Sequence, residues 1–295
     1  MKEYAVGVDV GGSHLCSSVI EVVTGEVCTE PVATPVDSKG GAAGVIAGLC
    51  GNVLETMNRF GGNVPRIGLA FPGPFDYDRG VSMIRGVSKY DGLFGLDVRE
   101  SLRSCLQPEI GPVDLRFVND ASAFALGECL GGAARENGRV LALTLGTGLG
   151  SGFVDSKRLV VSGETVPANG WVYCLPFDGG IADDAFSTRW IVRRFRELTR
   201  CDVSGAKEVA DRCAFDESAV RLFAEFGSRL AEFVAPLSER FGAERIVLGG
   251  NIAKAFPFFK DSLTEGLAIN SCGAEVSVSK LMDKAALTGA ASLFR

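Results

Sequence analysis

The stretch Arg116–Glu128 reads RFVNDASAFALGE. Phe117 and Val118 are typical of the end of a buried strand, and the small-residue pattern that follows predicts a helix. Asn119 and Asp120 therefore lie at a strand-to-helix junction, where a side chain can project into a cleft. Asp120 could simply cap the helix, because Asp and Asn are preferred at N-caps. A catalytic role competes with capping, since glycine-rich turns elsewhere in the chain could bring a phosphoryl group to the same place.

Two glycine-rich turns each join a pair of predicted strands. The strand at 4–10 has Asp9 near its end, and Gly11–Gly12–Ser13 turns the chain into the next strand. The pattern recurs at 139–154, where Gly146–Thr147–Gly148 forms the turn. Because glycine has no Cβ, consecutive N–H groups of such a turn can surround a phosphate, although an ordinary hairpin turn can have the same sequence.

The chain is long enough for two domains with a cleft between them. It has 295 residues, of which 46% are hydrophobic and 22% are charged, as in a globular protein with a substantial core. The recurrence of the glycine turn predicts an α/β protein with two similarly built domains, residues 1–120 and 121–295. In the second, 217–241 has helical spacing and is expected to bend or break at Pro236.

Charge and cysteine content argue against several classes of protein. The formal charge of −6 and the pI near 5.1 disfavour a nucleic-acid-binding surface, and the arginines at 189–196 are interpreted as a solvated helical face. The first residues contain too short an apolar run for a signal peptide or a membrane span. Nine single cysteines fit reduced thiols, and one histidine, His14, leaves the usual zinc ligand sets unavailable. We predict a cytoplasmic protein that binds neither nucleic acid nor a membrane.

Three further segments are candidates for contact with a ligand. Pro72–Gly73–Pro74 stops a predicted strand and turns the chain at an expected cleft edge. The irregular segment 76–96 is long for a connection and is typical of a binding element. At Gly249–Gly250–Asn251 a strand runs through two glycines into a helix, so that adenine or ribose could approach the backbone closely. Close packing alone requires the same residues.

Together these motifs resemble the ROK family of sugar kinases, within the wider group that shares the actin and hexokinase fold. Five segments carry the resemblance in family order: DVGGS at Asp9–Ser13, FPG at Phe71–Gly73, VNDASAFALGE at Val118–Glu128, LGTGLGSG at Leu145–Gly152 and VLGGNIA at Val247–Ala253. The resemblance implies two ribonuclease-H-like domains, with ATP and a sugar in the cleft between them. It also implies that the final helix, about 285–295, packs on the first domain.

The resemblance implies roles for the matching residues. Asp120 would be the general base that accepts the proton of a sugar hydroxyl as it attacks the γ-phosphate. Asn119 would hold a neighbouring hydroxyl, and the Gly73 backbone would approach the sugar ring. Asp9 would hold Mg²⁺, through water. Phosphate oxygens would be bound by the N–H groups of Gly11, Gly12, Ser13, Gly146, Thr147 and Gly148. The nucleoside pocket would be lined by Gly249, Gly250 and Asn251.

The chain departs from the family at one motif. Many members carry E-x-G-H followed by a cysteine-rich zinc motif, whereas the corresponding stretch here is ANGW, Ala168–Trp171. Structural zinc is therefore not expected, and the reducing end of the sugar must be recognised differently. The candidates are Asn169, Trp171 and the acid pair Asp183–Asp184, which could equally cap the helix that follows them. Family repressors place a DNA-binding domain ahead of the first phosphate loop; eight residues precede Asp9 here, so DNA binding is not expected.

The leading hypothesis is an ATP-dependent, glucokinase-like kinase of a hexose or amino sugar, with ATP and Mg²⁺ as cofactors. A homodimer is compatible with the apolar content. One alternative is a non-catalytic sugar-binding sensor or regulator descended from such kinases, motivated by the altered ANGW stretch. Another is an ATPase of the same fold that needs no sugar. Retention of both Asp9 and Asp120 disfavours the sensor, because a pure binding protein needs no base near bound phosphate.

Overall fold

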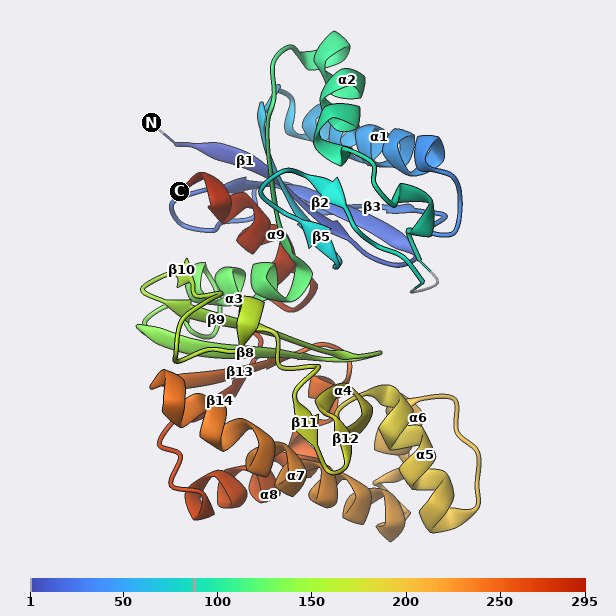
Figure 1. The fold of residues 1–295 in the computed structure, drawn as a ribbon, viewed down its shortest axis with the longest axis vertical. Coiled ribbons are helices and arrows are strands. Elements are labelled where there is room, and N and C mark those ends of the chain that lie inside the picture. The colour runs from blue at the N-terminus through green and yellow to red at the C-terminus, as the bar shows by residue number, and fades with distance from the viewer. Residues whose placement is uncertain (1, 87–88) are drawn as a thin grey trace. The chain divides into compact units, whose positions relative to one another are not determined.

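The computed structural model of the chain describes residues 2–86 and 89–295, so residues 87 and 88 of the segment 76–96 lie outside the described residues. The chain forms two compact units (Figure 1). Unit 1 consists of Met1–Gly132 and Asp283–Arg295, and unit 2 of Ala133–Met282. Unit 1 continues past the boundary predicted at residue 120, because helix α3 (Asp120–Leu130) packs on the last helix of the chain within that unit.

Unit 1 is built on a five-stranded sheet with the order β3-β2-β1-β4-β7. Its strands are β1 (Tyr4–Val10), β2 (His14–Glu21), β3 (Val32–Pro35), β4 (Arg66–Phe71) and β7 (Asp114–Asn119). The helices are α1 (Ala42–Phe60), α2 (Val98–Ile110), α3 and α9 (Ala285–Ala291), and β5 (Phe75–Asp76) pairs with β6 (Val81–Ser82). Strands β1, β4 and β7 are parallel, with Asp9 opposite Ala70 and Phe71 opposite Asn119. Their carboxyl ends therefore share the edge at which open α/β sheets bind ligands.

Alternation along β1 divides its side chains between two faces of the sheet. Val6 and Val8 are buried in the core formed with α1 and α2. Gly7 faces α9, since a Cβ placed on it would lie 2.0 Å from the carbonyl oxygen of Leu287. By the same alternation Asp9 lies on the α9 side. Helix α9 can approach β1 this closely because Gly7 has no side chain, so the acid at the strand end comes near the start of the last helix.

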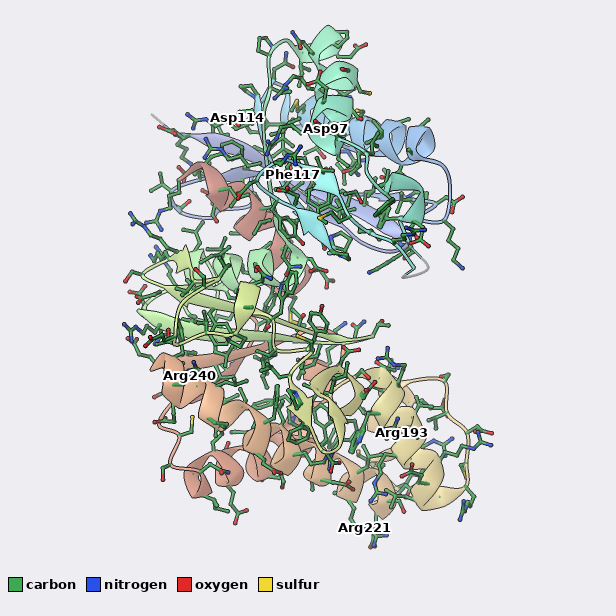
Figure 2. All side chains as sticks on the ribbon, viewed as in Figure 1. Asp97, Asp114, Phe117, Arg193, Arg221 and Arg240 are labelled. Atoms are coloured by element: carbon green, nitrogen blue, oxygen red, sulfur yellow. The ribbon has the colours of Figure 1, made fainter. Side chains whose placement is uncertain are left out.

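An aromatic cluster supports the Asn119–Asp120 junction from inside unit 1. The ring of Phe117, labelled in Figure 2, lies 6.4 Å from that of Phe71 and 5.3 Å from that of Phe75. The ring of Phe71 lies 5.8 Å from that of Tyr90. All four side chains are buried. The strand edge and the segment around Tyr90 therefore rest on one packed cluster.

Unit 2 repeats this topology. Its sheet has the order β10-β9-β8-β13-β14, from β8 (Arg139–Leu145), β9 (Leu149–Asp155), β10 (Arg158–Leu159), β13 (Arg245–Gly249) and β14 (Glu275–Val278). Strands β8 and β9 form an antiparallel hairpin, and β13 runs parallel to β8 and β14. The hairpins β1–β2 and β8–β9 thus occupy equivalent places in their sheets. The repeat of strand, glycine turn and strand in the sequence is a repeat of sheet topology.

The helices of unit 2 pack on its sheet and on one another. They are α4 (Ala182–Ala185), α5 (Thr188–Thr199), α6 (Ala206–Arg212), α7 (Glu217–Phe241) and α8 (Phe256–Ile269), and a short hairpin joins β11 (Pro176–Phe177) to β12 (Gly180–Ile181). Of the bend or break expected at Pro236, the break does not occur, because helix α7 continues through this residue. In the described parts of the chain, we find no helix with the length and hydrophobicity needed to cross a membrane.

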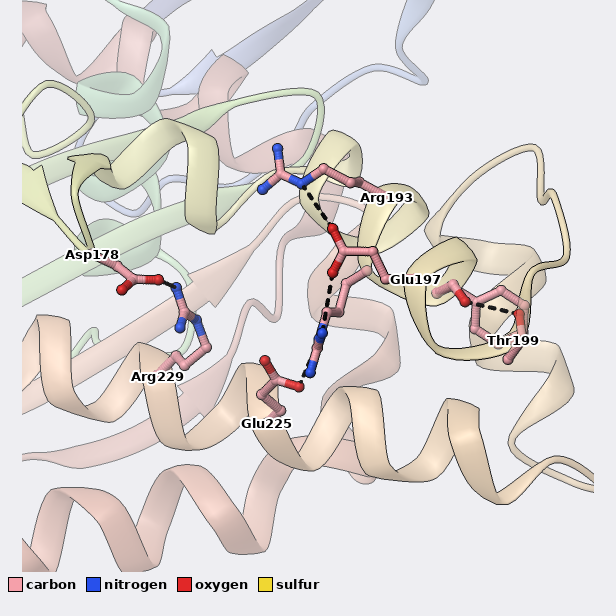
Figure 3. Close-up of polar contacts among 8 residues, drawn as sticks. Asp178, Arg193, Glu197, Thr199, Glu225 and Arg229 are labelled. Carbon is pink, nitrogen blue, oxygen red and sulfur yellow. Dashed lines mark hydrogen bonds and ion pairs between the residues drawn. The ribbon is translucent and has the colours of Figure 1, made fainter.

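The arginines of α5 are paired with acids (Figure 3). Arg193 lies 3.9 Å from Glu197, and Arg194 lies 3.1 Å from Glu197 and 2.9 Å from Glu225 of α7. A neighbouring pair joins Arg229 of α7 to Asp178 at 2.6 Å. The cluster is therefore largely neutralised on the protein itself, which agrees with its interpretation as a solvated face.

Candidate functional site

In the turn Gly11–Ser13, all three carbonyl oxygens accept hydrogen bonds from the protein, whereas two N–H groups are left free. Three donors hold those oxygens: the Tyr90 hydroxyl on Gly11 at 2.6 Å, the Ser38 hydroxyl on Gly12 at 2.5 Å and the Val36 N–H on Ser13 at 3.0 Å. The N–H of Gly11 donates to the His14 carbonyl at 3.1 Å, which closes the hairpin. The N–H groups of Gly12 and Ser13 have no acceptor among the described residues.

The turn Gly146–Gly148 of unit 2 has the same design. Its carbonyl oxygens are held as follows: Gly146 by the Thr188 N–H at 2.8 Å and hydroxyl at 2.9 Å, Thr147 by the Arg189 guanidinium at 3.1 Å, and Gly148 by the Gly146 N–H at 3.1 Å. The N–H groups of Thr147 and Gly148 are left without an acceptor in the described parts of the chain. Each turn therefore presents two consecutive free N–H groups, an arrangement that binds anions.

These hydrogen bonds alter one detail of the sequence prediction. It assigned phosphate contacts to every N–H in both turns, yet the N–H groups of Gly11 and Gly146 are already used within the turns. His14 is the first residue of β2, as expected, and its exposed ring contacts the Ser13 hydroxyl at 3.0 Å. The N–H groups still available to an anion are thus the pairs Gly12–Ser13 and Thr147–Gly148.

Asp183 braces the second turn. One carboxylate oxygen accepts the Leu149 N–H at 2.7 Å, and the other binds Arg189 at 2.6 Å. A Cβ on Gly148 would lie 2.7 Å from the first oxygen, so only glycine fits there without a shift of Asp183. Asp183, one of the acids considered for the sugar, is therefore committed to holding the turn.

Asn119, and not Asp120, caps helix α3. The Oδ1 of Asn119 accepts the N–H groups of Ala121 at 3.1 Å and Ser122 at 3.3 Å. Asp120 is the first residue of the helix, and its side chain is exposed. Its Oδ1 accepts the Ala121 N–H at 2.9 Å. The capping role that the sequence left open for Asp120 is filled by its neighbour, so this carboxylate is available for chemistry.

Tyr77 links two of the residues predicted to contact the sugar. The side-chain amide of Asn119 donates to the Tyr77 hydroxyl at 3.2 Å, and that hydroxyl donates to the carbonyl of Phe71 at 3.1 Å. A Cβ on Gly73 would lie 3.2 Å from the same hydroxyl. Asn119 and Gly73 therefore meet around Tyr77, a residue of the segment 76–96 that the sequence singled out only as a whole.

Three acids share the strand edge of unit 1. Burial, together with the charges of Asp120 and Asp283, raises the pKa of Asp9 to about 7, while Lys89 opposes the shift. The pKa of Asp120 is also raised, mainly by burial, against the lowering effects of the Ala121 N–H and Lys89. The Asp120 side chain is accessible to solvent but lies among many protein atoms, and those atoms cause the shift. Sequence reasoning missed Lys89 and Asp283.

The residues at Asp9 fit a magnesium ion carried by a nucleotide. In residues 2–86 and 89–295, no three His, Cys, Asp or Glu side chains gather into a metal-holding set. Mg²⁺ usually keeps several waters and is held by one or two carboxylates together with substrate phosphates, so a complete protein cage is not required. The crowded negative charge at Asp9 would be relieved by a divalent cation, which favours the ionised carboxylate.

The raised pKa of Asp9 predicts that the ligand-free protein loses stability as pH rises. The unfolded chain releases this proton near an ordinary pKa of about 3.9, whereas the folded chain retains it up to about 7. The folded state thus binds more protons in this window, and the contribution of Asp9 to the free energy of unfolding falls by at most about 4 kcal/mol. Urea unfolding in EDTA should show Asp9→Asn gaining stability over the wild type between about pH 5 and pH 8. If the difference in the free energy of unfolding between Asp9→Asn and the wild type stayed constant with pH, the raised pKa of Asp9 would be contradicted.

The remaining candidates lie in unit 2. Gly250 has φ of 80°, and a Cβ there would lie 2.4 Å from the Leu145 carbonyl oxygen, so close packing requires this glycine. Asn251 is exposed, and its Oδ1 accepts a hydrogen bond from the Lys254 ammonium at 2.9 Å. Asn169 is exposed in the left-handed conformation, with φ of 58°. Asp184 is also exposed, and neither it nor Asn169 has a hydrogen-bond partner within the described ranges. Both are free to contact a ligand.

Comparison with known proteins agrees with this geometry. The sequence model of the ROK family matches residues 5–295. The glucokinase of Thermotoga maritima is 26% identical, over 98% of this chain and 96% of that protein. The N-acetyl-D-glucosamine kinase of Mannheimia succiniciproducens is 27% identical, over 98% of each.

Solved structures give the same result for the fold. The ROK hexokinase from Thermus thermophilus has a TM-score of 0.81 at 26% identity, covering 98% of this chain and 97% of that one. A ROK family glucokinase from Streptomyces griseus, solved with glucose and AMPPNP, has a TM-score of 0.76 at 22% identity, covering 98% of each chain. The α/β fold of the actin and hexokinase type predicted from the sequence is confirmed, and the chain belongs to the ROK family.

Proposed function

We propose that this protein transfers the γ-phosphoryl group of ATP to a hydroxyl of a hexose or an amino sugar. One observation carries the proposal: at one strand edge, the exposed carboxylate of Asp120, which is not the helix cap, accompanies a glycine turn with two free N–H groups. A base for a hydroxyl and a site for phosphate are the parts that phosphoryl transfer requires. The related proteins named glucokinase and N-acetyl-D-glucosamine kinase support a sugar as the acceptor.

Different residues of the chain would contact the acceptor sugar and the phosphate. Asp120 accepts the proton of the attacking hydroxyl, and its raised pKa makes it a stronger base than an ordinary aspartate. The side-chain amide of Asn119, which contacts Tyr77 and the Asp120 carboxylate, would lie against a neighbouring hydroxyl of the sugar. The Gly73 backbone lies against the ring. The free N–H pairs Gly12–Ser13 and Thr147–Gly148 bind phosphate oxygens.

Magnesium would be held at Asp9 through water. When bound, the ion would neutralise phosphate charge and help to orient the triphosphate. Gly249, Gly250 and Asn251 would contact the nucleoside, and Gly250 and Asn251 are exposed. Asn169 and Asp184 would contact the reducing end of the sugar, since Asp183 is committed to the second turn. All nine cysteines lie in the described residues and none forms a disulfide, which supports a cytoplasmic location; a homodimer remains a prediction.

The test is ADP release from Mg²⁺–ATP across a panel of hexoses, N-acetylhexosamines and ketoses. We expect release that depends on one class of sugar and stops in EDTA. Release without any sugar would favour the ATPase hypothesis instead. A silent panel, with sugar or nucleotide still raising the melting temperature, would favour the non-catalytic sensor.

A further inference from the structure

Lys89 lies beside the first glycine turn and has no role in the function proposed above. A Cβ placed on Gly12 would lie 3.7 Å from Lys89 Cδ, so the lysine stem runs along the turn whose N–H groups are free. The ammonium acts electrostatically on both Asp9 and Asp120. It forms no hydrogen bond or ion pair with any described residue. Its charge is therefore available to a ligand.

The residue that follows Lys89 fixes this arrangement. Tyr90 is fully buried, its hydroxyl donates to Gly11 O at 2.6 Å, and its N–H donates to Ser38 O at 2.5 Å. Its φ of 60° lies in the left-handed region, which residues other than glycine seldom adopt. Such a conformation persists only where the surroundings determine it. The Lys89–Tyr90 segment and the glycine turn are thus one hydrogen-bonded assembly, and Lys89 is held next to the turn.

The charge balance at this edge calls for a cation. Asp9, Asp120 and Asp283 contribute three carboxylates, against the single ammonium of Lys89. A bound triphosphate would add further negative charge, of which an ion at Asp9 would offset a part. During transfer the charge on the γ-phosphoryl oxygens must be held by fixed donors. An ammonium beside the free N–H groups of the turn is placed to do this.

We propose that Lys89 is a further catalytic residue, which contacts the γ-phosphoryl group bound at Gly12 and Ser13. The inference rests on the proposed kinase function. In the step, the acceptor hydroxyl gives its proton to Asp120 as its oxygen bonds to the γ-phosphorus. The bond from phosphorus to the β,γ-bridging oxygen breaks, and ADP leaves with that electron pair. Lys89 takes no part in the proton transfer and donates hydrogen bonds to the γ-phosphoryl oxygens.

The test compares Lys89→Met and Lys89→Arg with Lys39→Met. Lys39 is exposed in the neighbouring loop and affects neither Asp9 nor Asp120, so it controls for loss of a lysine. Loss of a charge-assisted contact predicts that Lys89→Met lowers kcat about 10- to 100-fold. The KM for the sugar should stay within about threefold, and Lys89→Arg should recover part of kcat because it keeps the charge. A normal kcat with a raised sugar KM would overturn the proposal, since Lys89 would then bind the acceptor.

A binding measurement separates this proposal from the kinase function. Calorimetry with Mg²⁺ should show that Lys89→Met weakens AMPPNP at least about fivefold more than ADP, because only AMPPNP carries the γ-phosphoryl group. Equal weakening of both nucleotides, or of neither, would overturn the role of Lys89. If the wild type shows no sugar-dependent ADP release, the kinase function fails, and the ratio of the two affinities still decides whether Lys89 contacts the γ-phosphate.

Discussion

Asp120→Asn is expected to lower kcat for sugar phosphorylation by about 10³-fold, because a general base contributes about 10²- to 10⁴-fold. The amide has nearly the shape of the carboxylate and can still accept the Ala121 N–H, but it cannot take a proton from the sugar hydroxyl. Asn119 continues to cap α3, so the helix should begin at the same residue. Sugar affinity, measured by calorimetry, should change by no more than about fivefold, which corresponds to about 1 kcal/mol.

Asp114→Asn is the matched control for this experiment. Asp114, labelled in Figure 2, lies at the opposite end of the same strand, where it is exposed and pairs with Arg116 at 3.0 Å. Exposed pairs contribute little to stability, so this variant should behave like the wild type. If Asp120→Asn kept more than about a tenth of kcat, Asp120 would not be the base.

The sheets could be predicted because their signals are local. Alternating apolar residues at 4–10 and 139–145 predict strands, and the glycines that follow allow tight turns, so the hairpins follow from neighbouring residues alone. The equivalence of the two hairpins was also visible as a repeat. The polar signal at Asn119–Asp120 placed both residues correctly at a strand-to-helix junction. It could not decide which of them caps the helix, since both residue types are good caps.

The rest of the site depends on contacts between distant parts of the chain. The free N–H groups at Gly12 and Ser13 exist because Tyr90, Ser38 and Val36 hold the carbonyl oxygens of that turn. The sequence shows the glycines, but the spacing of those donors along the chain has no fixed relation to the turn. The same holds for Lys89 and Asp283, which only the fold brings near Asp9.

Pro236 shows how packing overrides a local rule. A proline within a helix removes one backbone hydrogen bond and crowds the preceding turn, which is why a break was expected. The preceding residues Phe233, Val234 and Ala235 are all buried, and α7 packs along α8. Burial of this apolar face stabilises α7 on both sides of the proline, so the helix continues to Phe241.

Gly68→Ala is expected to destabilise unit 1 by about 3 kcal/mol, at the upper end of the usual cost of overpacking. Gly68 lies in the middle of β4, where a Cβ would be 1.9 Å from the Ala290 carbonyl oxygen of α9. That contact involves the backbone of both elements, so no side chain can rotate away, and α9 must move. Because α9 also packs on β1 and α3, the displacement reaches the strand edge that holds Asp9 and Asp120.

The measurement has to report on unit 1, since Trp171 and Trp190, the two tryptophans of the chain, lie in unit 2. Amide hydrogen exchange in peptides from β1, β4 and α9 should become about 100-fold faster in Gly68→Ala, the factor that corresponds to about 3 kcal/mol. Gly51→Ala is the control, because Gly51 is exposed inside α1 with no atom within 4 Å of a built Cβ. There alanine should stabilise the helix by about 0.5–1 kcal/mol. If the two variants shifted exchange in the same direction, close packing of α9 on the glycines of the sheet would not be what holds the last helix in unit 1.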